Sequence, residues 1–350
     1  MAEAHLVGSM NLPDAETVFR VVGEHAGSSL RAVPDGERGR RAGWIVAQAP
    51  ILAANPQLQV RDTIPAYAGD RPRLVPADGV AVEDILIDLP YAEDGAESYA
   101  VFRRLRDQEG VLPAGTRLQV SIPSAVATLL PYIESDHHDA LLPRIEASLA
   151  AQIERLVAAV PTEDLAIQWD LAVEFNALET ELGRSTTYGF DELFASAARL
   201  AAFVPDGVEL GYHLCYGDAP PAPGAKGKHF VEPRDAGLLT DAANRLAATV
   251  DRRIDFIHLP VPIERRDEDY VAPLGRLALS PDTRLYLGLV HEEDGLDGAT
   301  ARAATAAKFV TGFGVGTECG LQNEPPEAIE RILRIQRDLE IPPVDHDRRR

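Results

Sequence analysis

Residues 165–215 decide the fold class of this chain. They begin with the apolar run LAIQWD (Leu165–Asp170) and end with a second such run, VELGYHLC (Val208–Cys215). Between the two runs, apolar residues recur every three or four positions, as a helix with one buried face requires. These residues are Phe190, Leu193, Ala197 and Leu200. A buried strand, a helix and another buried strand form a βαβ unit, in which the two strands are parallel.

The same alternation extends along most of the chain. Six further runs have the composition of buried strands: His5–Met10, Ile85–Leu89, Leu118–Ile122, Asp255–Val261, Leu285–His291 and Phe313–Cys319. Helical periodicity fills residues 142–160, 239–250 and 329–339, the last of these after Pro325-Pro326. Eight strands that alternate with helices predict a closed (β/α)₈ TIM barrel, an α/β fold. An open doubly wound sheet is the alternative, although no G-x-G-x-x-G or G-x-x-x-x-G-K-[ST] motif supports a nucleotide fold.

We expect one barrel domain over residues 1–341 and a flexible tail over 342–350. The stretch Asn11–Asp84 is less regular, and we expect it to form an elaborated N-terminal loop region over the barrel mouth. Residues 217–235, which are rich in Pro, Gly and Ala, predict a long loop after the fifth strand.

Composition excludes several classes of partner. The chain has 350 residues, with 34 Lys and Arg against 55 Asp and Glu, a formal net charge of −21. A charge of this sign repels nucleic acid and anionic lipid. No apolar run approaches the roughly 18 residues that a membrane helix needs, and the N-terminal residues do not have the pattern of a secretory signal. We therefore expect a cytoplasmic protein without nucleic-acid or membrane partners.

The two cysteines and one histidine form the strongest chemical pattern. His213 and Cys215 are two residues apart on a predicted strand, so their side chains point to the same side. Cys319 ends the last predicted strand. Because barrel enzymes build their sites at the carboxyl ends of the strands, these three residues are predicted to meet there. One imidazole and two thiolates are a typical zinc ligand set. A buried core position is the alternative for each residue alone.

Motifs in the same order along the chain resemble a known family. They are GSMNLP (8–13), IQWD (167–170), HLC (213–215), VH (290–291) and TECGL (317–321). Together they resemble the catalytic domain of cobalamin-independent methionine synthase, within the superfamily that includes uroporphyrinogen decarboxylase. The resemblance implies a TIM barrel that transfers a methyl or other alkyl group to a thiol such as homocysteine, in methionine biosynthesis.

The resemblance also implies roles for individual residues. His213, Cys215 and Cys319 would bind Zn²⁺, which would bind the thiol. Asp170 would hold the amino group of homocysteine, Ser9 would lie near its carboxylate, and His291 would transfer a proton near the leaving group. Glu37 lies in the loop GERGRRAG (36–43), which could reach over the mouth and contact the substrate. Solvated loop charge and a plain loop histidine are the alternatives for Glu37 and His291.

The sequence departs from the family pattern at two points. The family's fourth metal ligand is a glutamate on the sixth strand, where this chain has DFIHLPVPIER. His258 is the nearest candidate ligand, and it could instead face substrate or lie in the core. The segment SIPSAVAT (121–128) lacks the aromatic residue that stacks on folate. This absence makes methyl-folate a doubtful donor. A smaller alkyl donor, or a donor carried by a corrinoid protein, is therefore a further candidate.

Two other functions stay open at this stage. One is a decarboxylase-type or lyase enzyme on the same barrel without a thiol substrate, in which arginines of the N-terminal loop hold substrate carboxylates. The other is a noncatalytic binding protein with structural zinc or none.

Overall fold

Eight parallel strands form the centre of the protein. The computed structural model describes residues 2–66, 70–179, 186, 188–218 and 229–341. In sheet order the strands are β1 (Ala4–His5), β10 (Phe313–Thr317), β9 (Arg284–Val290), β8 (Phe256–Pro260), β7 (Glu209–Leu214), β6 (Leu165–Leu171), β5 (Arg117–Pro123) and β2 (Ala32–Pro34). Parallel bridges Ala4–Leu30 and Ser9–Gly36 join the first segment to the second and nearly close the sheet. The predicted (β/α)₈ TIM barrel is confirmed.

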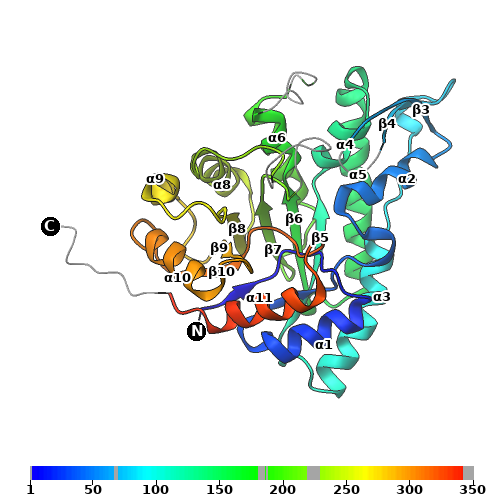
Figure 1. Cartoon of the computed structure of the whole chain (residues 1–350). Coiled ribbons are helices and arrows are strands. Elements are labelled where there is room, and N and C mark those ends of the chain that lie inside the picture. Colours follow the sequence, from blue (N-terminus) through cyan, green and yellow to red (C-terminus); the bar gives the residue numbers. More distant parts are fainter. Residues whose placement is uncertain (1, 67–69, 180–185, 187, 219–228, 342–350) are drawn as a thin grey trace.

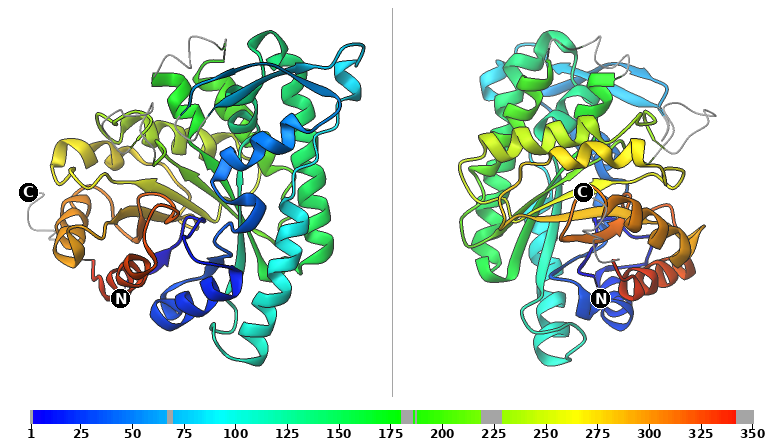
Figure 2. Two further views of the ribbon diagram at one scale, coloured as in Figure 1. Left: turned by 45° about the vertical axis from the view of Figure 1, so that its right-hand side comes forward. Right: turned by 90° about the vertical axis from the view of Figure 1, so that its left-hand side faces the viewer.

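Helices surround the strands on the outside, as Figures 1 and 2 show. They are α1 (Ala15–His25), α3 (Tyr91–Arg103), α5 (His138–Ala159), α7 (Phe190–Ala201), α8 (Gly237–Thr249), α9 (Glu268–Val271), α10 (Gly295–Ala306) and α11 (Pro326–Asp338). Each longer helix buries one apolar face; in α5 that face includes Leu141, Ile145, Leu149 and Leu156. All seven residues of β6 are buried, because helices cover its outer face and the barrel interior covers its inner face.

The carboxyl end of the barrel carries additional structure. Helices α4 (Ala125–Tyr132) and α6 (Val173–Glu179) directly follow β5 and β6. Near them lie α2 (Gln48–Ala53) and an antiparallel hairpin of β3 (Leu58–Ile64) and β4 (Arg71–Pro76), at the top right of Figure 1. A bridge from Leu74 to Ile133 attaches the hairpin to the end of α4. These elements form one wall of the mouth.

The predicted strand Ile85–Leu89 is wrong. The second barrel strand is β2, which has only three residues and ends in proline. In residues 85–89, Ile85, Ile87 and Leu89 are buried while Leu86 is 68% exposed, which imitates the alternation of a strand. The backbone of this segment forms hydrogen bonds with side chains and does not pair with a neighbouring strand. The Ile85 carbonyl accepts a hydrogen bond from Arg144, and the Ile87 carbonyl accepts one from Ser148.

The N-terminal region contains more regular structure than we expected. Besides loops, residues 11–84 hold α1, β2, α2 and the β3–β4 hairpin. The hairpin contains Pro65 between its strands and Pro72 within β4, and these prolines favoured a loop in the sequence. Of the predicted loop after the fifth strand, residues 219–228 lie outside the described residues, as does the predicted tail 342–350.

Among the described residues, the longest helices are too polar or too short to cross a lipid bilayer.

Candidate metal centre

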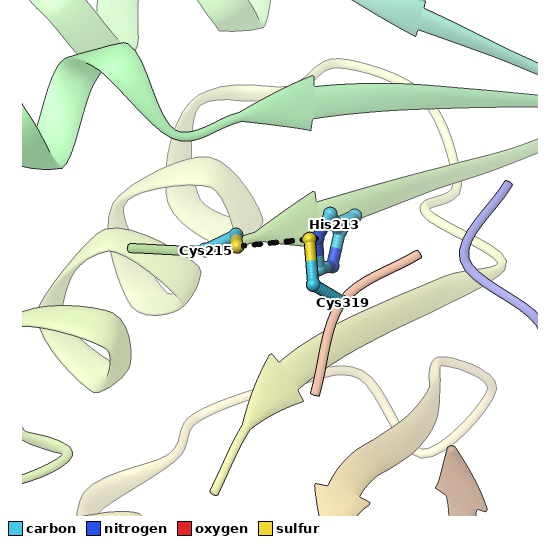
Figure 3. Close-up of side chains that lie close together, drawn as sticks. All are labelled: His213, Cys215 and Cys319. Atoms are coloured by element: carbon cyan, nitrogen blue, oxygen red, sulfur yellow. Dashed lines mark hydrogen bonds between the residues drawn. The ribbon is translucent and has the colours of Figure 1, made fainter. Parts of the chain in front are cut away.

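Three side chains from two strand ends meet at the barrel mouth. His213 is in β7, and Cys215 directly follows that strand; its backbone N–H continues the ladder by donating to the Leu171 carbonyl at 2.9 Å. Cys319 lies two residues beyond β10. The two Sγ atoms are 3.6 Å apart, and Cys319 Sγ is 3.8 Å from His213 Nε2. Figure 3 shows Cys319 reaching this place from a separate segment.

The donor set and its spacing fit zinc. One ligand atom from each residue lies within 4.8 Å of those of the other two. Two sulfurs bound to one tetrahedral zinc at about 2.3 Å are about 3.8 Å apart, and a bound sulfur and nitrogen are about 3.5 Å apart. The observed separations are close to both values. One zinc ion therefore fits between these atoms with little movement of the side chains.

The surroundings favour a thiolate at Cys215. A hydrogen bond with Cys319 Sγ and the nearby His213 imidazole lower the pKa of the buried Cys215 thiol, and the Gly217 N–H donates to its Sγ at 3.0 Å. Burial opposes charge on His213, but the Cys215 sulfur raises the pKa of that imidazole above its usual value. Deprotonated sulfur is the form that binds a metal.

His258 lies behind this trio. It is on β8, where it pairs in register with His213 of β7. Its Nδ1 is 2.7 Å from the His213 Nδ1, the ring atom that faces away from the cysteines. This contact places His258 outside the group of three, and the geometry gives no support to its predicted role as a fourth ligand.

A cavity of about 440 Å³ opens above the trio. It is lined by His213, Cys215 and Cys319, together with Ser9 and the two predicted substrate-binding carboxylates, Asp170 and Glu37. Most of the remaining lining is apolar and includes Trp44, Ile45, Pro131, Tyr132, Val173 and Phe230. The cavity therefore combines possible metal donors, carboxylates and an apolar surface.

Asp170 and Glu37 are buried acids that line this cavity and lie near enough to interact electrostatically. Asp170 pairs in register with His213 and accepts a hydrogen bond from Gln168 Nε2 at 2.8 Å. Burial raises the pKa of Asp170 to about 6. Burial and the Asp170 carboxylate raise the pKa of Glu37 well above its usual value. A carboxyl whose pKa is raised by a neighbouring carboxylate forms with it a site for a cation, which would relieve their repulsion.

Two loop residues near these acids have left-handed backbone conformations. The backbone φ angle is 52° at Glu37 and 55° at Trp44, values that residues other than glycine rarely adopt. A Cβ on Gly8 would come 2.3 Å from Glu37 Oε1, so the close approach of Glu37 depends on that glycine. Such strain is often found where function requires a particular side-chain position.

Ser9 and His291 occupy different environments. Ser9 lines the cavity, and its carbonyl accepts from the Leu321 N–H just beyond Cys319. His291 is buried behind the cavity wall: its Nε2 is 2.9 Å from the Val261 carbonyl oxygen, and its Nδ1 is 3.8 Å from Glu318 Oε2. Burial lowers the pKa of its imidazole. The role of His291 as a proton donor stays a prediction.

Sequence reasoning missed the link between two loops at this site. His229 Nε2 is 2.6 Å from Glu318 Oε1, and His229 Nδ1 is 2.9 Å from Glu232. Although burial opposes it, these carboxylates raise the pKa of His229 to about 9. The pair connects the segment that follows Cys215 with the segment that carries Cys319. Only the position of Glu318 next to Cys319 could have drawn attention to it.

The arginines of the N-terminal loop are engaged by the protein. Arg41 pairs with Asp35 and Asp94, and Arg40 pairs with Asp94 and Glu93. Arg38 donates to the Met10 carbonyl and to Gln322 Oε1. None of these three arginines lines the cavity above the trio in the described part of the chain.

Comparison with solved structures finds close counterparts of this barrel. The B12-independent methionine synthase from Shewanella sp. W3-18-1, solved with selenomethionine, superposes with a TM-score of 0.61 at 16% identity, over 96% of each chain. A proposed vitamin-B12-independent methionine synthase from Listeria monocytogenes superposes with a TM-score of 0.57 at 15% identity, over 95% of this chain and 94% of the other.

This chain has the fold of those B12-independent methionine synthases. The resemblance inferred from the sequence motifs is thereby confirmed at the level of the fold. No protein-family model matches the sequence, and no curated protein matches it. Evidence for function must therefore come from the site itself.

Proposed function

We propose that this protein is a zinc-dependent enzyme that transfers a methyl or other small alkyl group to a thiol, with homocysteine as the first candidate. The observation that supports this most is the trio His213, Cys215 and Cys319, which lines a cavity that also contains buried acids. Three protein ligands leave one position for a substrate, which is typical of catalytic zinc sites. When bound, zinc would hold a thiol as its thiolate near neutral pH.

The two buried carboxylates of the cavity suit a substrate that is an amino acid. In this proposal the carboxylates of Asp170 and Glu37 bind the ammonium group of homocysteine, whose positive charge offsets their mutual repulsion. Ser9, which lies next to Glu37 through the bridge from Ser9 to Gly36, would be near the substrate carboxylate. With its ammonium and carboxylate held, the thiol of homocysteine would extend toward the cysteine sulfurs. Such alignment accounts for much of the rate that an enzyme gains.

The apolar lining of the cavity fits the alkyl donor. The reaction forms a bond between the thiol sulfur and the alkyl carbon and breaks the bond from that carbon to its leaving group, which then takes up a proton. We assign this proton to His291, the role that the sequence resemblance implies for it. Trp44 and Tyr132 offer aromatic surface for a small donor. A donor carried on a corrinoid protein would have to enter by the same mouth.

The decarboxylase-type alternative has less support. It relies on the arginines of the loop 36–43 to hold substrate carboxylates, but Arg40 and Arg41 of that loop already pair with carboxylates of the protein.

Zinc analysis tests the proposal directly. We expect about one zinc per chain, and X-ray absorption at the zinc edge should show two sulfur ligands and at least one nitrogen ligand. Addition of homocysteine should add one sulfur to the ligands of the zinc. Cys319→Ser should lose most of the zinc, whereas His25→Gln, which changes a histidine at the end of α1, should keep it. A metal-free protein with full activity, or a metal whose ligands do not change with the thiol, would refute the proposal.

A further inference from the structure

His258 is a buried histidine for which alkyl transfer to a thiol has no direct use. It is fully buried inside the barrel on β8, next to the ligand-bearing strand β7. Its ring centroid is 4.9 Å from that of His213, and the two Nδ1 atoms are 2.7 Å apart. At this distance one Nδ1 must carry a proton and donate it, while the other accepts.

The position of the cysteines decides which ring donates. His213 Nε2 faces Cys319 Sγ, so Nε2 is the atom available to a metal. A neutral imidazole that binds metal through Nε2 carries its proton on Nδ1. His213 Nδ1–H therefore donates, and His258 Nδ1 accepts.

Two glycines hold the His258 ring in the orientation that this requires. A Cβ at Gly288 of β9 or at Gly316 of β10 would come 2.9 Å from His258 Nε2. The ring thus fills a space that is open because the adjacent strand β9 and the next strand β10 both have glycine there.

We infer that His258 is a positioning residue that holds His213 in the tautomer and ring orientation needed to bind metal through Nε2. This inference rests on the proposed zinc site and deepens it. Histidines that bind metals commonly donate their second ring nitrogen to a nearby acceptor, and loss of that acceptor commonly weakens metal binding about 10- to 100-fold. Here the acceptor is a second histidine on the adjacent strand.

The first test measures zinc affinity in chelator competition. His258→Leu removes the acceptor but keeps an apolar side chain of similar size, and we expect zinc to bind about 10- to 100-fold more weakly. His258→Gln, whose amide oxygen can accept, should recover most of the loss. His138→Leu is the matched control, because His138 is also a buried histidine but lies on α5, where its ring bonds to the Ile133 carbonyl and to none of the trio; it should change the affinity less than threefold. Circular dichroism checks that each variant is folded.

The second test uses the unaltered protein and does not depend on the folding of a variant. In zinc-loaded protein with ¹⁵N-labelled histidine, nuclear magnetic resonance should show His213 protonated at Nδ1 and His258 protonated at Nε2. The opposite tautomers would overturn the inference, as would unchanged zinc affinity in folded His258→Leu. Loss of one nitrogen ligand from the zinc-edge spectrum of His258→Leu would make His258 a ligand and also overturn it. If the unaltered protein binds no zinc at all, the proposed function fails first, and the inference fails with it.

Discussion

Replacement of Glu174 by glutamine should stabilise the protein at alkaline pH but much less at acidic pH. Glu174 lies in the first turn of α6 and is fully buried. Its Oε1 accepts from the Ser124 hydroxyl, the group that caps α4, and its Oε2 has no hydrogen-bond partner. No Lys or Arg of the described residues forms an ion pair with it. Burial therefore raises the pKa of Glu174 from 4.5 to about 7.

The sign and size of the effect follow from this shift. A carboxyl whose pKa is raised by folding contributes stability below pH 4.5 and loses that contribution as the pH rises through 7. Each pKa unit corresponds to about 1.4 kcal/mol, so at pH 8.5 the buried charge costs about 3 kcal/mol. At pH 5 the cost is below about 1 kcal/mol, because the folded protein keeps its proton. Glutamine is neutral at both pH values, and its amide can still accept from Ser124.

Urea denaturation of both proteins at pH 5 and pH 8.5 measures the effect. The difference in the free energy of unfolding between Glu174→Gln and the unaltered protein should be about 2.5 kcal/mol more favourable to the variant at pH 8.5 than at pH 5. Contributions from titrating groups that do not interact with Glu174 cancel in this difference; Asp170 does interact with it and raises its pKa further. Glu24→Gln, an exposed change on α1, should show no such pH dependence. A difference that is the same at both pH values would refute the reasoning.

Three further predictions concern the metal, the substrate and the barrel wall. Removal of zinc by a chelator should lower the melting temperature, because a ligand present at 1,000 times its dissociation constant adds about 4 kcal/mol to the free energy of unfolding; an unchanged melting curve would contradict a bound metal. Asp170→Asn should raise the KM for homocysteine about 10- to 100-fold, as expected when a hydrogen bond between charged groups is lost, and should leave a thiol without an amino group unaffected. Equal losses for both thiols would count against the assignment. Arg302→Met should lower the free energy of unfolding by about 2–4 kcal/mol, because it leaves the Leu289 and Ile263 carbonyls without their donor, while Asp294 keeps Arg266 as a partner. Urea denaturation would show this, and a loss below about 1 kcal/mol would disprove it.

Local patterns account for most of the fold that could be predicted. The strands that begin near Arg117, Leu165, Glu209, Phe256, Arg284 and Phe313 are long, apolar and bounded by helices with a clear periodicity. The second strand could not be found in this way. β2 is three residues long and gains its place from pairing with β5, whereas the extended residues 85–89 have the stronger local pattern but no partner strand.

The trio of possible zinc ligands could be predicted because its geometry is almost entirely local. The side chains of His213 and Cys215 share one face because residues two apart on a strand always do, and Cys319 joins them because parallel strands end at the same edge. The structure brings these three together as the sequence indicated.

The sequence by itself therefore determined the class of fold, the end of the barrel that carries the site and the three possible ligands, since each follows from a short repeat or from strand polarity. Only the tertiary structure decided that His258 lies behind His213, that Glu37 comes close to Asp170, and that His229 reaches Glu318. In sequence, the residues of these three pairs are 45, 133 and 89 positions apart, respectively. Their geometry depends on how strands and loops pack, which no local pattern of residues encodes.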